Sequence, residues 1–375
     1  MNIHTKYLYR LGHQAEFGAN EFYSLTKIKP AFYNSDFLFS DEEVEINKTG
    51  ALVYRAEIIA TQNNQQTFKN FLTDNLPKAF EKFPSKKIGF SFPNSDLNEK
   101  QIILMAKTIG YKKINLLSAG KEPNIGNFIG TNSWIIATEI ENNWILAQVQ
   151  EYSNQEFWSL LDQQLPINDM KRGLINLKLA RTLMNFNSGQ KIWDPFCGVG
   201  RNLVSAIDLK SDFLGSDISP ECLSEANSNF NFAFKFYSDE KPKAKLKEIF
   251  EADVTTLEND NSGYYNNYNI VTEGYLGHNF VTRPTPKEQQ QELKKIVLLW
   301  QLALKNFEKL QISEIVTCLP FYYSQNNNLS LDLDSILTST KYKYQLFLND
   351  KKSLFYRRKD SFVGHQVVKL QLVLD

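Results

Sequence analysis

Short apolar runs alternate with amphipathic stretches along the first 155 residues. The short runs have the length and residue types of β-strands, and the amphipathic stretches place apolar residues at helical spacing. We therefore expect strands at 6–11, 52–60, 87–92, 114–117, 133–140 and 143–150, and helices at 13–25, 67–83 and 98–110. This alternation predicts an N-terminal α+β region of two ferredoxin-like modules, one over residues 1–84 and one over residues 85–155.

The pattern changes near residue 186, where apolar strands begin to alternate regularly with helices. Such alternation is typical of a doubly wound, mostly parallel sheet, so we predict an α/β fold for residues 186–375. The expected elements are helices at 201–209, 220–230 and 285–307, strands at 314–319 and 344–348, and a hairpin over 354–374 with Asp360, Ser361 and Gly364 in its turn. Residues 156–185 are polar and contain Pro166 and Gly173, which indicates a linker leading into a helix.

Composition narrows the functional classes. The 42 basic and 42 acidic residues give a formal net charge of zero, so no long-range field draws the chain to a nucleic acid or a membrane. Three widely spaced cysteines and four scattered histidines give no sign of a disulfide framework or a metal site. The N-terminus is too polar for a signal peptide, and no apolar run approaches the roughly 18 residues needed to span a bilayer. We expect a cytoplasmic protein without a metal.

The most informative stretch is KIWDPFCGVGRN, residues 191–202. An apolar strand ends at Asp194, Gly198 and Gly200 permit unusual φ angles and close backbone approach, and a helical pattern follows. The dinucleotide fingerprint GxGxxG fails because its third glycine is Leu203. An acid and a proline precede the glycines instead, which suits a ligand with an ammonium group that Asp194 would face.

Two further acids follow at the spacing of successive βα units. Asp217 ends a second apolar strand, where an acid binds ribose hydroxyls in Rossmann-type sites. Asp253 ends a third strand, where an adenine amino group would lie. Each feature alone could serve only the fold. Together, three carboxylates at successive strand ends, without a P-loop lysine, indicate S-adenosylmethionine as the ligand.

DPFCGVG resembles the DPFCGTG motif of class I methyltransferases of the THUMP-associated RNA methylase family. The resemblance implies a Rossmann-like domain over residues 186–375, with a mostly parallel seven-stranded sheet and a terminal antiparallel hairpin. It also implies that residues 156–185 cover the methionine end of the cofactor, since Asp169–Gly173 and Lys178–Ala180 match that family's segment. The expected cofactor-binding residues are Asp194, Pro195, Phe196, Gly198, Gly200, Asn202, Asp217, Ile218, Asp253 and Lys178.

The N-terminal half resembles the same family less strongly. YLYRLGHQAEFGANEF is similar to its opening motif, and KIGFSF with the strands after it is similar to a THUMP module, which binds the acceptor end of tRNA. Residues 1–150 carry only 16 basic against 15 acidic residues. RNA affinity depends on phosphate neutralisation, so such a domain must gather its lysines on one face or bind weakly. The candidates are Lys86, Lys87, Lys112, Lys113 and Lys121.

NIVTEGYLG, residues 269–277, lies where amino-group methylases of this kind carry [D/N/S]PP[Y/F/W]. Aligning the aromatic residue places Thr272, Glu273, Gly274 and Tyr275 on the motif, without either proline. In one interpretation Glu273 replaces the usual Asp or Asn, and Tyr275 stacks on a flipped base. In the others, the substrate has no flipped base, or the protein does not catalyse.

The resemblance as a whole implies a transferase in tRNA processing that methylates N2 of a guanosine. Near the C-terminus, YRRKDSFVGHQVV also resembles a motif of the family, and Arg357, Arg358 and Lys359 are candidates for phosphate contacts. A DNA or protein amino-group methyltransferase and a non-catalytic, cofactor-binding RNA-binding subunit stay as alternatives. The first would call for a separate target-recognition region, and the second for damage to Asp194 or the glycines; the sequence displays neither.

Overall fold

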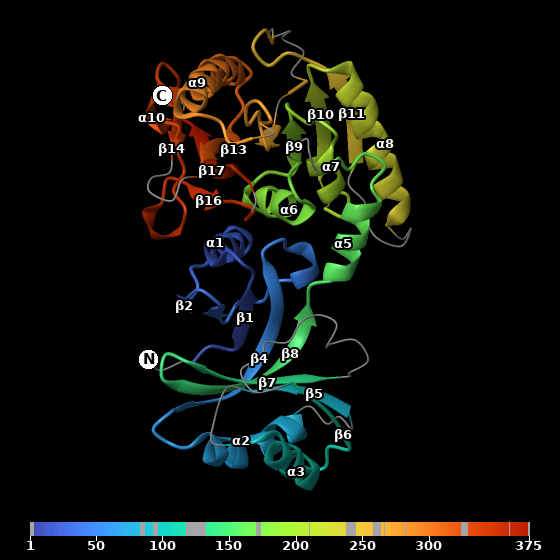
Figure 1. Ribbon diagram of the computed structural model, residues 1–375, viewed down its shortest axis with the longest axis vertical. Coiled ribbons are helices and arrows are strands. Elements are labelled where there is room, and N and C mark those ends of the chain that lie inside the picture. The colour runs from blue at the N-terminus through green and yellow to red at the C-terminus, as the bar shows by residue number, and fades with distance from the viewer. Residues whose placement is uncertain are drawn as a thin grey trace. The chain divides into compact units, whose positions relative to one another are not determined.

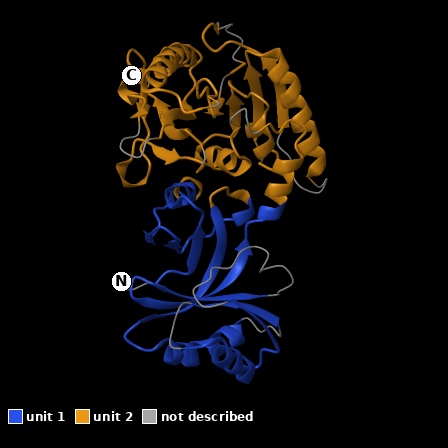
Figure 2. Cartoon of the chain, in the orientation of Figure 1, with its two compact units in different colours: residues 1–22, 26–47, 52–156 blue, residues 23–25, 48–51, 157–375 orange. Residues whose placement is uncertain are grey.

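The computed structural model describes residues 4–82, 87–92, 97–117, 133–169, 174–209, 211–237, 245–257, 264–265, 267–280, 282–323, 329–359 and 361–373. The chain divides into two compact units (Figure 2). Unit 1 comprises residues 1–22, 26–47 and 52–156, and unit 2 comprises residues 23–25, 48–51 and 157–375. Among the helices in the described ranges, none has the length and apolar content that crossing a bilayer requires.

Unit 1 is built on an eight-stranded sheet in the order β2-β3-β1-β4-β8-β7-β5-β6. Helices α2 and α3 lie side by side (Figure 1), with α2 packed against β4 and β8 and α3 against β6. The strands are β1 (Tyr7–Leu11), β2 (Phe32–Tyr33), β3 (Phe37–Ser40), β4 (Leu52–Asn63), β5 (Lys87–Ser91), β6 (Lys113–Leu116), β7 (Trp134–Ile140) and β8 (Asn143–Tyr152). The helices are α1 (Ala15–Thr26), α2 (Phe68–Lys82) and α3 (Glu99–Ile109).

All nine elements predicted for this region are present, with small shifts at their ends. Strands β2 and β3 were not expected, because β2 has two residues and β3 is buried at all four positions, which removes the alternation that marks a strand. Strand β4 pairs with β8, so strands from both sides of the predicted boundary at 84/85 share one sheet. The division into two modules stays a prediction.

Unit 2 is an α/β fold with a mostly parallel sheet, as the sequence predicted. Its sheet follows the path β11-β10-β9-β12-β13-β17-β15, and β14 and β16 are added beside β13 and β17. Strands β9 to β13 pair in parallel, and β17 is antiparallel to both β13 and β15. The strands are β9 (Lys191–Asp194), β10 (Asp212–Asp217), β11 (Lys245–Glu251), β12 (Asn269–Thr272), β13 (Glu314–Tyr322), β14 (Leu329–Ser330), β15 (Tyr342–Tyr344), β16 (Leu354–Tyr356) and β17 (Val363–Leu372).

The helices of unit 2 cover this sheet. Helix α8 lies beside β10 and β11 (Figure 1), and α9 packs on β12 and β13 through a cluster that contains Ile270, Trp300 and Ile315. Strand order reverses between β9 and β12, and in open α/β sheets ligands bind beyond the carboxyl ends of the strands at such a point. The helices are α5 (Gln155–Gln164), α6 (Leu177–Phe186), α7 (Arg201–Ser205), α8 (Pro220–Phe236), α9 (Pro286–Lys309) and α10 (Leu333–Leu337).

Several predicted details of unit 2 are corrected. Helix α5 occupies the start of the expected linker, because Trp158 and Leu161 bury one helical face. Helix α7 ends four residues early, and the strand expected at 344–348 lies instead at β15. The terminal hairpin is confirmed, but Gly364 pairs with Phe321 inside β17, and Asp360 lies outside the described residues.

Candidate functional site

The glycine turn after β9 has the predicted strand, turn and helix. Gly198 and Gly200 have φ angles of +49° and +78°, both in the left-handed region that favours glycine. A Cβ at Gly200 would lie 3.0 Å from Cβ and 3.1 Å from Cα of Ala226 on α8, so the close backbone approach at this residue is to α8. A Cβ at Gly198 would meet nothing within 4 Å. The open space of the turn is therefore at Gly198, where a ligand would fit.

Asp194, at the end of β9, is only 2% exposed. Its Oδ1 accepts a hydrogen bond from the Phe196 N–H at 3.2 Å, and its Oδ2 accepts one from Asn202 Nδ2 at 2.9 Å. Burial raises the pKa of Asp194 to about 7, although hydrogen bonds from Thr272, Asn202 and Phe196 oppose the shift; nearby Asp217 adds to it. A cationic group beside Asp194 would stabilise the ionised form of this buried carboxylate.

Asn202, next to Asp194, has a second buried polar atom, Oδ1, without a hydrogen-bond partner in the described residues. A buried acceptor of this kind costs free energy until a donor reaches it. Asp194, Asn202 and the space at Gly198 together fit the ammonium end of S-adenosylmethionine.

The other two acids end the neighbouring strands, on the same edge of the sheet. Asp217, at the end of β10, accepts hydrogen bonds from Gly198 N–H at 2.8 Å and from Ser219 N–H at 3.0 Å. Asp253 follows β11 and accepts hydrogen bonds from the N–H and hydroxyl of Thr255, at 2.8 and 2.7 Å. Asp217 therefore belongs to the glycine turn, whereas Asp253 makes local bonds.

The remaining predicted cofactor residues lie on nearby elements. Pro195 is buried, and the Phe196 ring lies 5.5 Å from the Trp300 ring, centroid to centroid. Ile218 follows Asp217 and is 64% exposed, so it offers apolar surface beside that acid. Lys178 lies in the first turn of α6, which packs on α7.

The predicted acceptor motif follows β12, next to the glycine turn. Thr272 is buried, and its hydroxyl accepts the Gly274 N–H at 3.0 Å. Gly274 has φ +70°, and a Cβ there would lie 2.8 Å from Cζ2 of Trp300. Both the φ angle and the crowding exclude a proline at position 274, one of the two proline positions of the motif that the sequence resembles.

Tyr275 presents its ring to the surface, with 44% of the residue exposed. Its hydroxyl lies 3.4 Å from Oε1 of Glu292 on α9, and burial followed by the nearby Glu292 charge raises the pKa of Tyr275. The same Oε1 accepts the His278 N–H at 3.0 Å. Glu292 therefore holds the loop that carries the candidate stacking ring.

Sequence reasoning missed Glu292, His365 and Arg201. Glu292 lies on the apolar face of α9, four residues before Ile296, and an acid at that position was an available signal. His365 on β17 pairs with Glu273 at 2.6 Å, Nε2 to Oε1, across 92 residues of sequence. No local pattern indicates that contact.

Arg201, the first residue of α7, is 3% exposed and binds both α5 and the segment between α5 and α6. It donates to the Asp162 carboxylate, the Ile175 carbonyl and Asn168 Oδ1. Burial, followed by the charge of Arg358, lowers the pKa of Arg201 to about 10.

Asn229 on α8 reinforces this attachment. Its side chain donates to the carbonyls of Val199 and Ile167, at 2.9 and 3.1 Å, and accepts the Ile167 N–H at 2.9 Å. These bonds join the glycine turn to the segment that the sequence assigns to cofactor coverage. Of the matched residues in that segment, 170–173 lie outside the described ranges.

The candidate phosphate-binding residues are placed in part. Lys87 and Lys113 are exposed register partners at the start of β5 and β6, and Lys112 is exposed beside them; Lys86 and Lys121 lie outside the described residues. Arg357 donates to the carbonyls of Lys359 and Ser361, and Arg358 to that of Leu174. These two arginines hold the backbone of unit 2.

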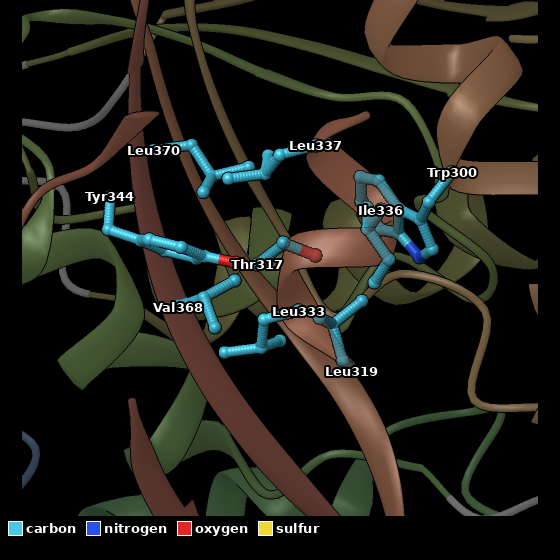
Figure 3. Close-up of a pocket in the computed structure, with 9 residues that line it drawn as sticks. All are labelled: Trp300, Thr317, Leu319, Leu333, Ile336, Leu337, Tyr344, Val368 and Leu370. Carbon is cyan, nitrogen blue, oxygen red and sulfur yellow. The ribbon is translucent and has the colours of Figure 1, made fainter. Parts of the chain in front are cut away.

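A small cavity lies behind Gly274, between α9, α10 and the strands β13, β15 and β17 (Figure 3). Trp300 and Thr317, which crowd Gly274, also line it. Its volume of about 10 Å³ is that of a single water, so it is too small for a substrate. Among the described residues, no group of three or more His, Cys, Asp or Glu is arranged to hold a metal ion.

No known family and no curated protein matches this chain by sequence. Several solved structures are similar in fold. SMU.472 complexed with SAH is 11% identical over 100% of both chains, with a TM-score of 0.48. A predicted N6-adenine-specific DNA methylase from Listeria monocytogenes str. 4b F2365 is 10% identical over 97% of this chain and 95% of its own, with a TM-score of 0.48.

TrmN from Thermus thermophilus is 11% identical over 98% of this chain and 99% of its own, with a TM-score of 0.47. Identities and scores of this order say nothing about the chemistry of this chain. That chemistry has to be inferred from the site itself.

Proposed function

We propose that this chain is an S-adenosylmethionine-dependent methyltransferase that methylates an exocyclic amino group in tRNA, namely N2 of a guanosine. One observation carries the proposal: β9 and β12 pair in parallel, so Asp194, the acid of the candidate cofactor turn, and Thr272, the first residue of the candidate acceptor motif, lie at the carboxyl ends of neighbouring strands. A methyl donor held by Asp194 and an acceptor held after β12 would therefore be neighbours, as an in-line displacement requires.

The cofactor roles follow from the strand ends. Asp194 would hold the ammonium group, Asp217 the ribose hydroxyls and Asp253 the adenine amino group, with Ile218 as apolar surface for the adenine ring. S-adenosylmethionine, when bound, supplies a methyl group on a sulfonium, a good leaving group. Arg201 and Asn229 would keep the covering segment over the site and exclude water.

The acceptor roles belong to the loop after β12. Glu273 and the Gly274 carbonyl would accept hydrogen bonds from the target amine and stabilise the positive charge that develops on it. The exposed ring of Tyr275 would stack on a base flipped out of its helix, which is worth about 1–3 kcal/mol per base.

The tRNA substrate rests on the family resemblance of residues 1–155, in which residues 85–155 would form the RNA-binding module. Lys87, Lys112 and Lys113 gather at one end of β5 and β6 and would supply phosphate contacts. Residues 156–185 would cover the cofactor, and residues 186–375 would carry the chemistry.

The test is transfer of labelled methyl from S-adenosylmethionine to unmodified total tRNA, followed by digestion and mass identification of the nucleoside. We expect N2-methylguanosine from the wild-type protein and none from Asp194→Ala. Unmodified DNA and a total protein extract serve as competing substrates. Label in either of these alone, or cofactor binding without transfer to any substrate, would contradict the proposal.

A further inference from the structure

Glu273 is paired with a histidine that the acceptor motif does not contain. Its Oε1 lies 2.6 Å from Nε2 of His365, and the two side chains are 21% and 10% exposed. Within the described ranges, the structure gives Glu273 no other side-chain hydrogen bond. His365 is therefore the group that sets the position of this carboxylate.

The proton of His365 must be on Nε2. Placing an unprotonated Nε2 at 2.6 Å from a carboxylate oxygen would bring two lone pairs together, whereas a protonated Nε2 donates a charge-assisted hydrogen bond. Nδ1 is buried and has no partner among the described residues, so nothing there competes for the proton. The ring acts as a donor to Glu273.

Neighbouring strands fix the ring itself. His365 lies in β17, in register with Pro320 of β13 and Tyr356 of β16. The Tyr356 ring meets it edge-on at 5.8 Å between centroids, and the Tyr356 hydroxyl accepts a 2.7 Å hydrogen bond from Asn176. Asn176 caps α6, the helix that begins just after the covering segment.

We propose that His365 is a positioning residue for the methyl-acceptor site: it holds one oxygen of Glu273 so that the remaining carboxylate lone pairs are aimed at the target amine. The inference rests on the proposed function. When the nitrogen gains the methyl group, the bond between that group and sulfur breaks and its electron pair stays on sulfur. The nitrogen then becomes cationic and loses a proton, which the aimed carboxylate accepts.

The test compares His365→Leu, which cannot donate, with His365→Gln, whose side-chain amide can. With unmodified total tRNA, we expect His365→Leu to lower kcat about 10- to 100-fold, the scale of a small misplacement of a reacting group. KM for tRNA and the affinity for S-adenosylmethionine, measured by calorimetry, should not change. His365→Gln should recover kcat to within about threefold of the wild-type value on that same scale. A Leu variant as active as wild type, or a Gln variant as poor as Leu, overturns the role of His365.

A second readout separates this inference from the proposed function. The chain has four histidines, so the ¹⁵N signals of His365 are assigned by their absence in His365→Leu. We expect the Nε2–H tautomer in the wild-type protein and a mixture of tautomers in Glu273→Ala. If the wild type methylates no substrate, the proposed function fails; a tautomer mixture in the wild type overturns the pairing whether or not methylation is seen.

Discussion

The backbone N–H of Gly198 donates a 2.8 Å hydrogen bond to the carboxylate of Asp217. This bond joins the glycine turn after β9 to the acid after β10. Asp217 would therefore have two roles under the proposed function: it orders the turn and would accept hydrogen bonds from the ribose hydroxyls.

Asp217→Ala should accordingly weaken S-adenosylmethionine binding more than Asp253→Ala, whose carboxylate bonds only to Thr255 in the described structure. A lost charge-assisted hydrogen bond is worth about 1.5–3 kcal/mol, so we expect a loss of affinity of roughly 10- to 100-fold for Asp217→Ala. Titration calorimetry of the two variants measures the difference. Equal losses would show that Asp217 does not order the turn.

Asp194 should make the stability of the unliganded protein depend on pH. Burial raises its pKa from the ordinary 3.8 to about 7. Between these two pH values the folded state holds a proton that the unfolded state has lost. This contribution is fully present below pH 3.8 and disappears as the pH rises through about 7; it amounts to roughly 4 kcal/mol. Asp194→Asn should therefore gain stability relative to wild type between pH 4 and pH 8, measured by denaturant unfolding. If the difference in the free energy of unfolding between the two proteins stayed constant from pH 4 to pH 8, the raised pKa of Asp194 would be contradicted.

The raised pKa of Asp194 should also make cofactor binding depend on pH. An ammonium group favours the ionised carboxylate, so the affinity for S-adenosylmethionine should rise as the pH passes through about 7. Calorimetry in buffers of different ionisation enthalpy should detect proton release below that pH. Binding without pH dependence would place the ammonium group away from Asp194.

Elements of the fold and site that depend on residues close in sequence could be predicted, whereas contacts between residues far apart in sequence could not. Helix α9 follows from its apolar spacing and from the Thr285–Glu288 capping box, and the glycine turn follows from local residues. The Glu273–His365 contact joins residues 92 apart, and it depends on the pairing of β12 with β13 and of β13 with β17. Local patterns likewise could not show that α8 crowds Gly200.

Gly200 and Gly198 should respond differently to alanine. Both substitutions force alanine into a left-handed φ, which costs about 1–2 kcal/mol, but only Gly200→Ala also pushes a methyl group against Ala226. We expect an additional 1–3 kcal/mol of destabilisation at Gly200, typical of overpacking. Denaturant unfolding of both variants tests this, and similar losses of stability would argue against the close approach to α8.

Gly274→Pro, which places a proline where the resembled motif has one, should inactivate the protein. Proline cannot adopt φ +70°, lacks the N–H that bonds to Thr272, and its ring atoms would enter the space of Trp300. We expect a loss of about 3 kcal/mol or more in the free energy of unfolding, together with loss of methyl transfer. A stable Gly274→Pro protein with higher activity would mean that this loop adopts the family conformation during catalysis.

Substitution of Tyr275 should weaken recognition of the target base without changing cofactor binding. Its ring is exposed, and its hydroxyl makes one long bond to Glu292, so removing the ring should leave the fold intact. Tyr275→Ala should bind S-adenosylmethionine with wild-type affinity but lose the stacking worth about 1–3 kcal/mol, which lowers kcat/KM for tRNA roughly 5- to 150-fold. Tyr275→Phe keeps the ring and loses only the hydroxyl, so it should retain most of the activity. If Tyr275→Ala methylates tRNA as well as the wild type, the target base does not stack on this residue, and the ring serves the loop that Glu292 holds.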